Sequence, residues 1–496
     1  MRAGRRLQLL VICGGRQVAE WIDNSPVYHD YPIEEFRDNP LIACLKLPPK
    51  DFEEASLRLF RFPKFKESER DLDSTFRALL PARLTQFFVA NRHHVEIFRH
   101  VQRQILGGYS VRNPMTQDGQ QLLHNAGTPG SRIGPVNPSK ISFVTGLSGQ
   151  GKSALMRAIM PAVGPAVIQH SNFREKTFTE TQILYLMRNV PDQCGPKALA
   201  KVFGDHADEM LQKNLYGRMF SDRSMTRTDY VSTLRKIVAN HHVGVLILDE
   251  FQNLSLAGTV GQQELIALLV NIRDELGVPI ILVGTYKAAD VLAGNACTAR
   301  RLVEGGFHEL KRPMSAEDED WRVFCEIAWN YQWVRNPMDL SEDILAVLYE
   351  CSQGITGIML TVFIAAQIEA IDSGEEKVDA DLLRKVYCRR FEPLHNIIDA
   401  LRRNEQAFLN RYDDLYMKAF SQLKEDQLLG RVDVIKNQMT RAHENQLGID
   451  LLTDRGKRIP SRPDKMAGEL AANVLSASTA LPDVLTSSLV RRVVER

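Results

Sequence analysis

A glycine-rich stretch in the first third of the chain carries the residue types that hold phosphate groups. Residues 146–153 read GLSGQGKS, which has the spacing G-x-x-x-x-G-K-S. Gly146, Gly149 and Gly151 allow backbone amides to approach phosphate oxygens without a Cβ in the way. Lys152 is expected to reach the β- and γ-phosphates, and the Ser153 hydroxyl is expected to bind Mg²⁺. A turn that merely joins a strand to a helix is the alternative, but the flanking apolar strand and helix favour a site for ATP and Mg²⁺.

A pair of carboxylates follows a second apolar run. The stretch VGVLILDE ends in Asp249 and Glu250. A buried strand would place both carboxylates at its carboxyl end, where ligands bind in open α/β sheets. Asp249 is predicted to hold Mg²⁺, directly or through water, and Glu250 is predicted to polarise the attacking water. An acidic helix cap after a core strand is the alternative, which a phosphate loop in the same sheet disfavours.

Two further stretches contribute candidate site residues. VPIILVGT ends at Thr285, which is placed to contact the γ-phosphate or its water, although threonine also simply ends strands. The stretch CTARRLVEGGFHEL contains Arg300 and Arg301. Three roles stay open for this pair: a surface charge, a DNA contact, or a finger that stabilises phosphate charge in a neighbouring subunit.

Apolar runs that alternate with helical stretches must position these residues. ISFVTG, AVIQHS, TQILYLMRNV, GVLILDE and VPIILVGT read as buried parallel strands, which predicts an α/β layer architecture. The segment after residue 313 has a purely helical pattern, which predicts a lid. The predicted domains are an N-terminal region (1–108), a linker (109–139), a nucleotide-binding core (140–313), a helical lid (314–392), and a C-terminal helical extension with a tail (393–496).

Composition limits the class of protein. The 496 residues suffice for two or three domains, and the net charge of +1 means that any nucleic-acid surface is local. The seven cysteines form no C-x-x-C pair, which argues against a zinc site or a disulfide framework and suits a reducing cytoplasm. No apolar run is expected to reach the roughly 18 residues of a membrane span, so no membrane partner is expected.

The motifs together resemble the AAA+ ATPases of the TnsC/TniB group, which regulate transposition in target-selecting transposons. The likeness covers residues 70–392 and rests on GLSGQGKS, LILDEFQNL, IILVGTYKA, ARR and the lid stretch SQGITGIML. It implies an AAA+ parallel sheet flanked by helices, with a C-terminal helical lid and extensions at both ends. It also implies Asp249 and Glu250 as Walker B, Thr285 as sensor 1, and Arg300 or Arg301 as a finger across a subunit interface. GITGIML offers no sensor 2 arginine, so slow, partner-stimulated hydrolysis is expected.

The resemblance also implies partners. Members of this group assemble on duplex DNA as rings or filaments. They connect a target selector of the TnsD/TniQ type to the transposase TnsB and to TnsA-like endonuclease subunits. By this likeness, the N-terminal region of this chain would help to bind the selector, and its C-terminal tail would serve the TnsA and TnsB partners.

Two basic stretches are candidates for the DNA contact. NFREKTF contains Arg174 and Lys176, and LYGRMFSDRSMTRTDY contains Arg218, Arg223 and Arg227. Serine and threonine hydroxyls lie between these charges, which suits sequence-independent contacts to the phosphate backbone. Solvated charged loops are the alternative.

Other functions remain open on this sequence. An origin-initiator or helicase-loader-like AAA+ ATPase would share the core, although no winged-helix domain is recognisable after the lid. A nucleotide-gated scaffold would bind ATP to assemble, with incidental hydrolysis. A small-molecule kinase is disfavoured by the helical lid and the arginine pair.

Overall fold

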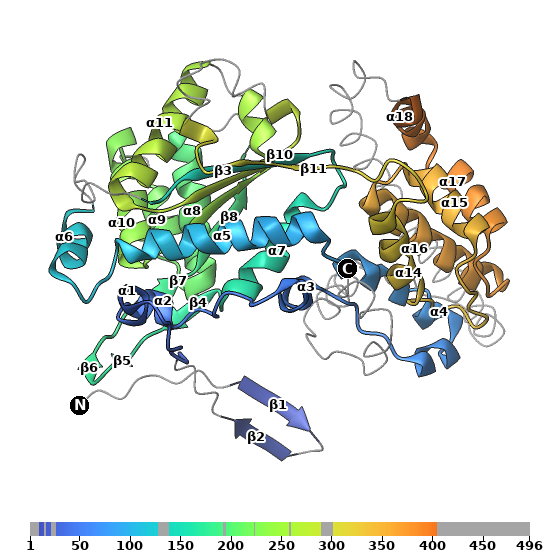
Figure 1. The fold of residues 1–496 in the computed structure, drawn as a ribbon, viewed down its shortest axis with the longest axis horizontal. Helices are drawn as coiled ribbons and strands as arrows, with labels where there is room; N and C mark the ends of the chain where they lie inside the picture. The colour runs from blue at the N-terminus through green and yellow to red at the C-terminus, as the bar shows by residue number, and fades with distance from the viewer. Residues whose placement is uncertain are drawn as a thin grey trace, which may run out of the picture. The chain divides into compact units, whose positions relative to one another are not determined.

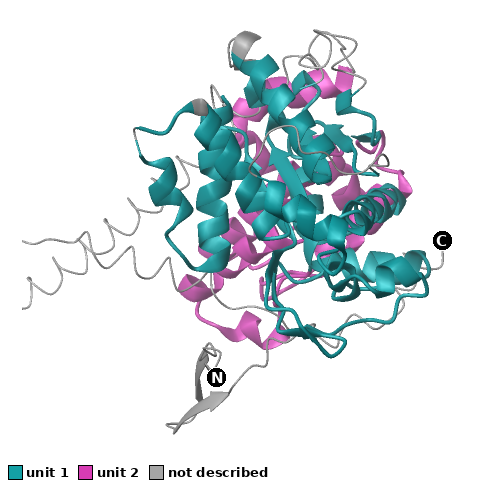
Figure 2. Cartoon of the chain, turned by 90° about the vertical axis from the view of Figure 1, so that its left-hand side faces the viewer, with its two compact units in different colours: residues 1–61, 88–311 teal, residues 62–87, 312–496 magenta. Residues whose placement is uncertain are grey.

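The computed structural model describes the backbone of residues 9–13, 16–20, 26–126, 138–191, 195–222, 224–256, 259–288 and 301–403. Within these ranges, the side chains of residues 9–20, 227, 255, 256, 259 and 260 lie outside the description. The chain divides into two compact units (Figure 2). Unit 1 comprises the residues up to Arg61 and Phe88–Lys311, and unit 2 comprises Phe62–Phe87 and the residues from Arg312 onward.

Unit 1 is built on a five-stranded sheet in which every neighbouring pair of strands is parallel. The strand order is β11-β3-β10-β9-β8. Every residue of β3, β9 and β10 is buried, as expected for parallel strands covered on both faces. The strands are β3 (Ile141–Gly146), β8 (Tyr185–Asn189), β9 (Val245–Asp249), β10 (Ile280–Gly284) and β11 (Phe307–Leu310).

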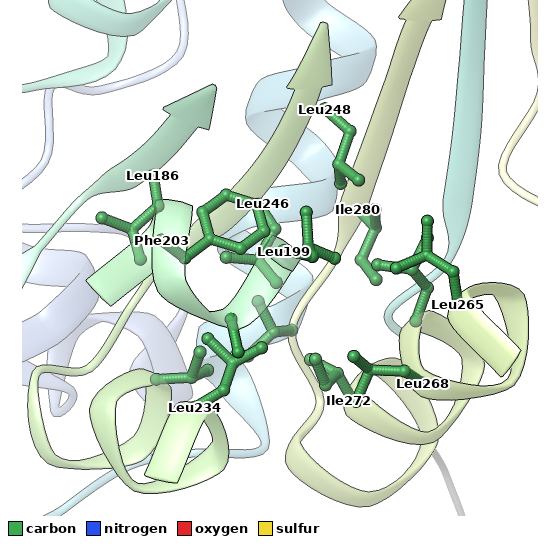
Figure 3. Packing of buried hydrophobic residues seen from close by; sticks show 14 of the residues in the cluster. Leu186, Leu199, Phe203, Leu234, Leu246, Leu248, Leu265, Leu268, Ile272 and Ile280 are labelled. Atoms are coloured by element: carbon green, nitrogen blue, oxygen red, sulfur yellow. The ribbon is translucent and has the colours of Figure 1, made fainter. Parts of the chain in front are cut away.

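Helices cover the sheet (Figure 1). Leu246 and Leu248 of β9 point with Ile280 of β10 into one apolar cluster with Phe203 and Ile272 (Figure 3). That cluster is closed by α8 (Pro196–Leu211), α10 (Arg227–Asn240) and α11 (Thr259–Leu276). Helix α7 (Lys152–Val163) packs against β3 and β10, and α5 (Arg92–Ser110) and α3 (Phe52–Leu59) pack on α7. Successive side chains of a strand point to opposite faces of the sheet. Because every residue of β3, β9 and β10 is buried, these inner strands are covered on both faces.

Smaller elements complete unit 1. The run AVIQHS and the start of TQILYLMRNV differ from the prediction, because β4 (Val167–Gln169) pairs antiparallel with β7 (Thr181–Ile183) outside the main sheet. The rest of TQILYLMRNV forms β8, which is a parallel strand of the main sheet as predicted. Helix α6 (Gln117–Asn125) lies within the segment predicted as a linker. The others are β1 (Leu9–Cys13), β2 (Arg16–Glu20), α1 (Glu34–Arg37), α2 (Pro40–Ala43), β5 (Asn172–Phe173), β6 (Lys176–Thr177), α9 (Tyr216–Phe220) and η3 (Phe251–Leu256).

Unit 2 joins the lid helices to a segment from the N-terminal region. That segment, Phe62–Phe87, is called the strap and contains η1 (Glu67–Asp71), α4 (Ser74–Arg77) and η2 (Leu80–Gln86). Both α4 and η2 pack on α16. The guanidinium of Arg77 donates to both carboxylate oxygens of Glu376. The lid helices are α14 (Glu319–Trp329), α15 (Glu342–Ser352), α16 (Thr356–Ser373), α17 (Ala380–Arg390) and α18 (Glu392–Arg403).

One lid helix corrects the expectation that no apolar run is long enough to span a membrane. By length and composition alone, α16 is able to cross a membrane, with 18 residues and a mean hydropathy of 1.3. Half of this window is buried, and α16 packs between α15, α17 and the strap. Its apolar character is therefore that of a helix in the core of unit 2.

Candidate nucleotide-binding site

The predicted phosphate loop joins the end of β3 to the start of α7. Gly149 and Gly151 adopt left-handed backbone conformations, with φ of 84° and 85°. A Cβ on Gly151 would meet no atom within 4 Å, so the backbone conformation rather than a lack of space calls for glycine there. At Gly146 the reason differs, because a Cβ would lie 2.7 Å from the carbonyl oxygen of Leu310 in β11.

Lys152, the first residue of α7, turns its ammonium group back into the loop. Lys152 as a whole is only 8% exposed, and its Nζ donates to the carbonyl oxygens of Gly146 at 2.8 Å and Leu147 at 2.9 Å. Charged phosphate oxygens are stronger partners for an ammonium group than neutral carbonyls. Ser153 follows in the first turn of α7 and is half-buried. The loop therefore brings a buried cation and a hydroxyl to the amino end of a helix, which is a favourable place for an anion.

The strand register aligns the other candidates at the carboxyl edge of the sheet. Thr145 of β3 lies opposite Gly284 of β10, and Leu282 of β10 lies opposite Leu248 of β9. The residues that follow, Asp249 and Thr285, therefore emerge at the same edge as the phosphate loop. Asp249 is 2% exposed, and its Oδ1 accepts a hydrogen bond of 2.9 Å from the backbone N–H of Glu250.

Two buried hydroxyls at this edge lack partners. Among the described residues, neither Thr145 Oγ1 nor Thr285 Oγ1 has a hydrogen-bond partner, and these residues are 0% and 1% exposed. Leaving a buried hydroxyl unsatisfied costs about 1–3 kcal/mol. Such groups fit a site that a polar ligand completes, so the residues present suit a nucleotide with its phosphates at this edge. Sequence reasoning missed Thr145, although a threonine just before the first loop glycine was the available signal.

Glu250 is held by a neighbour that sequence reasoning also missed. Glu250 has a left-handed φ of 54°, and its carboxylate accepts a hydrogen bond from Nε2 of Gln252. Oε1 of the same Gln252 accepts from the backbone N–H of Thr285 at 3.1 Å. The stretch DEFQNL contained this residue, but its type alone assigns no role. The structure thus connects Glu250, just after β9, to the end of β10 through one side chain.

The predicted finger arginines lie in the segment before β11. Arg301 is exposed, and Arg300 lies outside the described residues. Their assignment to a subunit interface therefore remains a prediction.

The candidate DNA contacts lie on different elements. Arg174 lies in the β5–β6 turn, with a left-handed φ of 46°, and forms an ion pair with Asp38. Its guanidinium carbon lies 5.4 Å from the ring centre of Phe173. Lys176 of β6 and Arg218 of α9 are exposed. Arg227 is the first residue of α10, but its side chain lies outside the described residues, as does the whole of Arg223.

Comparisons with known proteins agree with this geometry. The family model described as AAA domain matches residues 137–292. No curated protein matches. The Walker-type ATPase PABY2304 of Pyrococcus abyssi is 16% identical, with 60% of this chain and 78% of that chain covered at a TM-score of 0.35.

Two other solved structures are similar at the same low level. The ORC1 protein of Aeropyrum pernix, solved in complex with DNA, is 15% identical over 60% of this chain and 71% of its own, with a TM-score of 0.37. The RuvB Holliday junction branch migration motor of Thermotoga maritima is 14% identical over 57% and 76%, with a TM-score of 0.30. Values this low carry no argument about activity or partners.

The family match and the fold lead to one conclusion. The matched residues contain the predicted phosphate loop, Asp249, Glu250 and Thr285. They also contain four of the five strands of the parallel sheet, and the helical region follows them in the chain. The predicted fold class is therefore confirmed: residues 137–292 are similar to an AAA domain, within an α/β architecture of the AAA+ type.

Proposed function

We propose that this chain binds and hydrolyses ATP with Mg²⁺ at the carboxyl edge of its parallel sheet. The observation that carries the proposal is the buried ammonium of Lys152 in a loop with left-handed glycines, at the same sheet edge as the Thr285 hydroxyl, which has no partner in the described part of the chain. Lys152 and the loop amides would hold the phosphates, while Ser153 and Asp249 would hold Mg²⁺. When bound, Mg²⁺ would neutralise charge on the phosphate oxygens.

The remaining residues would act on the attacking water. The Glu250 carboxylate is a hydrogen-bond acceptor that would orient this water and take its proton. Thr285 would place its hydroxyl against the γ-phosphate or the water. Arg300 or Arg301 would complete the site of a neighbouring subunit, so that full activity would depend on assembly.

Removal of the loop cation tests this proposal. Lys152→Ala is expected to lower kcat/KM for ATP by at least about 100-fold, because a preorganised charge at the phosphates is lost. Phosphate release by the purified chain with Mg²⁺ measures the effect. Lys140→Ala is the matched control, since Lys140 is a half-exposed lysine directly before β3, the strand that leads into the loop. Equal activity of Lys152→Ala and wild type would refute the assignment of this loop.

We further propose that the ATPase regulates DNA transposition. The proposal is supported by the likeness of LILDEFQNL, IILVGTYKA and the GIT lid stretch to the TnsC/TniB group. The chain would oligomerise on duplex DNA and connect a TnsD/TniQ-type selector to TnsB and TnsA-like subunits, and hydrolysis would remodel or dissolve the assembly. The proposed partner-binding N-terminal region would then contribute to both units, because the strap belongs to unit 2.

The proposed DNA contacts make a prediction about salt dependence. Arg174→Ala is expected to weaken binding to a duplex of any sequence and to reduce the salt slope by about 0.9, the share of one phosphate contact. Fluorescence anisotropy at several salt concentrations, with ATP and Mg²⁺, measures both quantities. Arg322→Ala is the matched control, because Arg322 also pairs on the surface with a carboxylate, Glu342. An unchanged affinity and slope would remove Arg174 from the interface.

The same titration separates the proposal from the initiator alternative. A regulator that contacts only the phosphate backbone binds unrelated duplexes equally, whereas an origin initiator must read base edges or DNA shape. A strong preference for one duplex in a set of unrelated sequences would favour the initiator function.

A further inference from the structure

The side chain of Gln252 connects two candidate catalytic elements. It lies in η3, which follows β9 in the chain, and it is hydrogen-bonded to both Glu250 and Thr285. Its Nε2 donates to Oε2 of Glu250, and its Oε1 accepts from the backbone N–H of Thr285 at 3.1 Å. Both partners fix the orientation of the amide, because a carboxylate accepts only from the NH₂ group and a backbone N–H donates only to the oxygen. A flipped amide would lose both bonds.

The backbone around Gln252 is shaped for this bridge. A Cβ on Gly284, the last residue of β10, would lie 2.9 Å from Oε1 of Gln252 and 3.4 Å from the Cβ of Phe251. The glycine therefore leaves the space that the amide oxygen needs to reach the end of β10. On the other side, the left-handed φ of Glu250 directs the chain from β9 into η3, so that residues 250 and 252 can pair.

We propose that Gln252 is a positioning residue that directs the Glu250 carboxylate and couples it to the strand end that carries Thr285. This inference rests on the proposed ATPase function. The Thr285 hydroxyl is buried and has no partner among the described residues, so a bound nucleotide is its natural partner. A shift of Thr285 on contact with the nucleotide would move its backbone N–H, and Gln252 would pass this movement to Glu250.

Two variants of Gln252 separate positioning from packing. Gln252→Met keeps the length of the side chain and removes both hydrogen bonds. It is expected to lower kcat by about 30-fold and to leave KM for ATP within about 2-fold, because misdirection of the base affects the chemical step. Gln120→Met is the matched control, since Gln120 is exposed on α6 in the same unit. Thermal unfolding of each full-length variant verifies that it is folded.

Gln252→Glu adds a readout that packing alone would not move. The new carboxylate keeps an acceptor for the Thr285 N–H but repels Glu250 when it is ionised. Its kcat is therefore expected to be at least as low as that of Gln252→Met, whereas a role in packing alone would leave the kcat of this variant, which has nearly the same size, close to that of wild type.

The outcomes distinguish this inference from the proposed function. The inference is overturned if the wild type hydrolyses ATP and Gln252→Met does so equally well. It is also overturned if the loss lies in KM alone, or if Gln252→Glu retains the kcat of wild type. A wild type that hydrolyses no ATP, with or without duplex DNA, overturns the proposed function and this inference with it.

Discussion

Replacing Glu250 with glutamine is expected to lower kcat for ATP by about 1,000-fold, within the range that general bases contribute. An amide cannot take a proton from water. It has the same size as the carboxylate, and its oxygen can still accept the hydrogen bond from Gln252 Nε2, so the local structure should persist. Nucleotide affinity should therefore stay within about 2-fold, because binding depends on Lys152 and the loop amides. Single-turnover hydrolysis and equilibrium binding of ATP measure the two effects separately.

An exposed glutamate outside the candidate site serves as the control for Glu250→Gln. Glu53→Gln changes an exposed glutamate on α3 and should leave kcat unaltered. If Glu250→Gln retained wild-type kcat, Glu250 would not be the base. The same variant tests the scaffold alternative by electron microscopy on duplex DNA. If assembly, partner recruitment and target choice all survive without hydrolysis, ATP serves as an assembly ligand. Remodelling of the assembly by hydrolysis would then be excluded.

The second large effect concerns the stability of unit 2. The side chain of Arg77 is 0% exposed and that of Glu376 is 13% exposed. Glu376→Ala is expected to destabilise unit 2 by about 3 kcal/mol, because it leaves a buried guanidinium without its counter-charge. Three of the four tryptophans, Trp321, Trp329 and Trp333, lie in unit 2, so tryptophan fluorescence during urea unfolding reports mainly on this unit.

The pH dependence of this effect has a definite sign. The hydrogen bonds from Arg77 are the largest cause that holds the pKa of the Glu376 carboxyl below its ordinary value. A carboxyl with a lowered pKa in the folded state stabilises at neutral pH, and this contribution is lost as the pH falls through the folded-state pKa. The difference between wild type and Glu376→Ala should therefore shrink on acidification. A difference that stays constant down to acid pH would contradict a role for the charge.

Two comparisons complete this test. Glu342→Ala breaks the exposed pair with Arg322 and should cost no more than about 1 kcal/mol. The double variant Arg77→Met with Glu376→Leu should recover much of the lost stability, because neither partner then leaves a buried charge. If the double variant were as unstable as Glu376→Ala, the loss would come from packing rather than from the unpaired guanidinium.

Local signals in the sequence predicted the elements that carry the chemistry. The loop glycines have fixed spacing, and the apolar runs before Asp249 and Thr285 correspond to the buried strands β9 and β10. These features need no information about distant residues. The assignment to the TnsC/TniB group and the roles of the arginines, by contrast, stay predictions.

Features that depend on long-range pairing were not predicted. Strand β11 is a four-residue edge strand with one fully buried residue, Leu310, so it lacks the apolar run that marks the inner strands. The bridge through Gln252 depends on Gly284 in another strand, and the strap depends on Glu376, far along the chain. Nothing in the local pattern of residues encodes which distant partner each of these will meet.

The strap has a consequence for how the chain is made. Phe62–Phe87 leaves the ribosome before all of Phe88–Lys311, yet its packing partners in α14 and α16 come only afterwards. Until then, the apolar side chains of Pro81, Leu84 and Phe87 lack the lid helices against which they are buried in the folded unit. Exposed apolar segments of this kind favour aggregation. Unit 2 therefore cannot complete its fold during synthesis until its last helices emerge. A truncated chain that starts after Phe87 would contain every lid helix and still lack part of the lid's core.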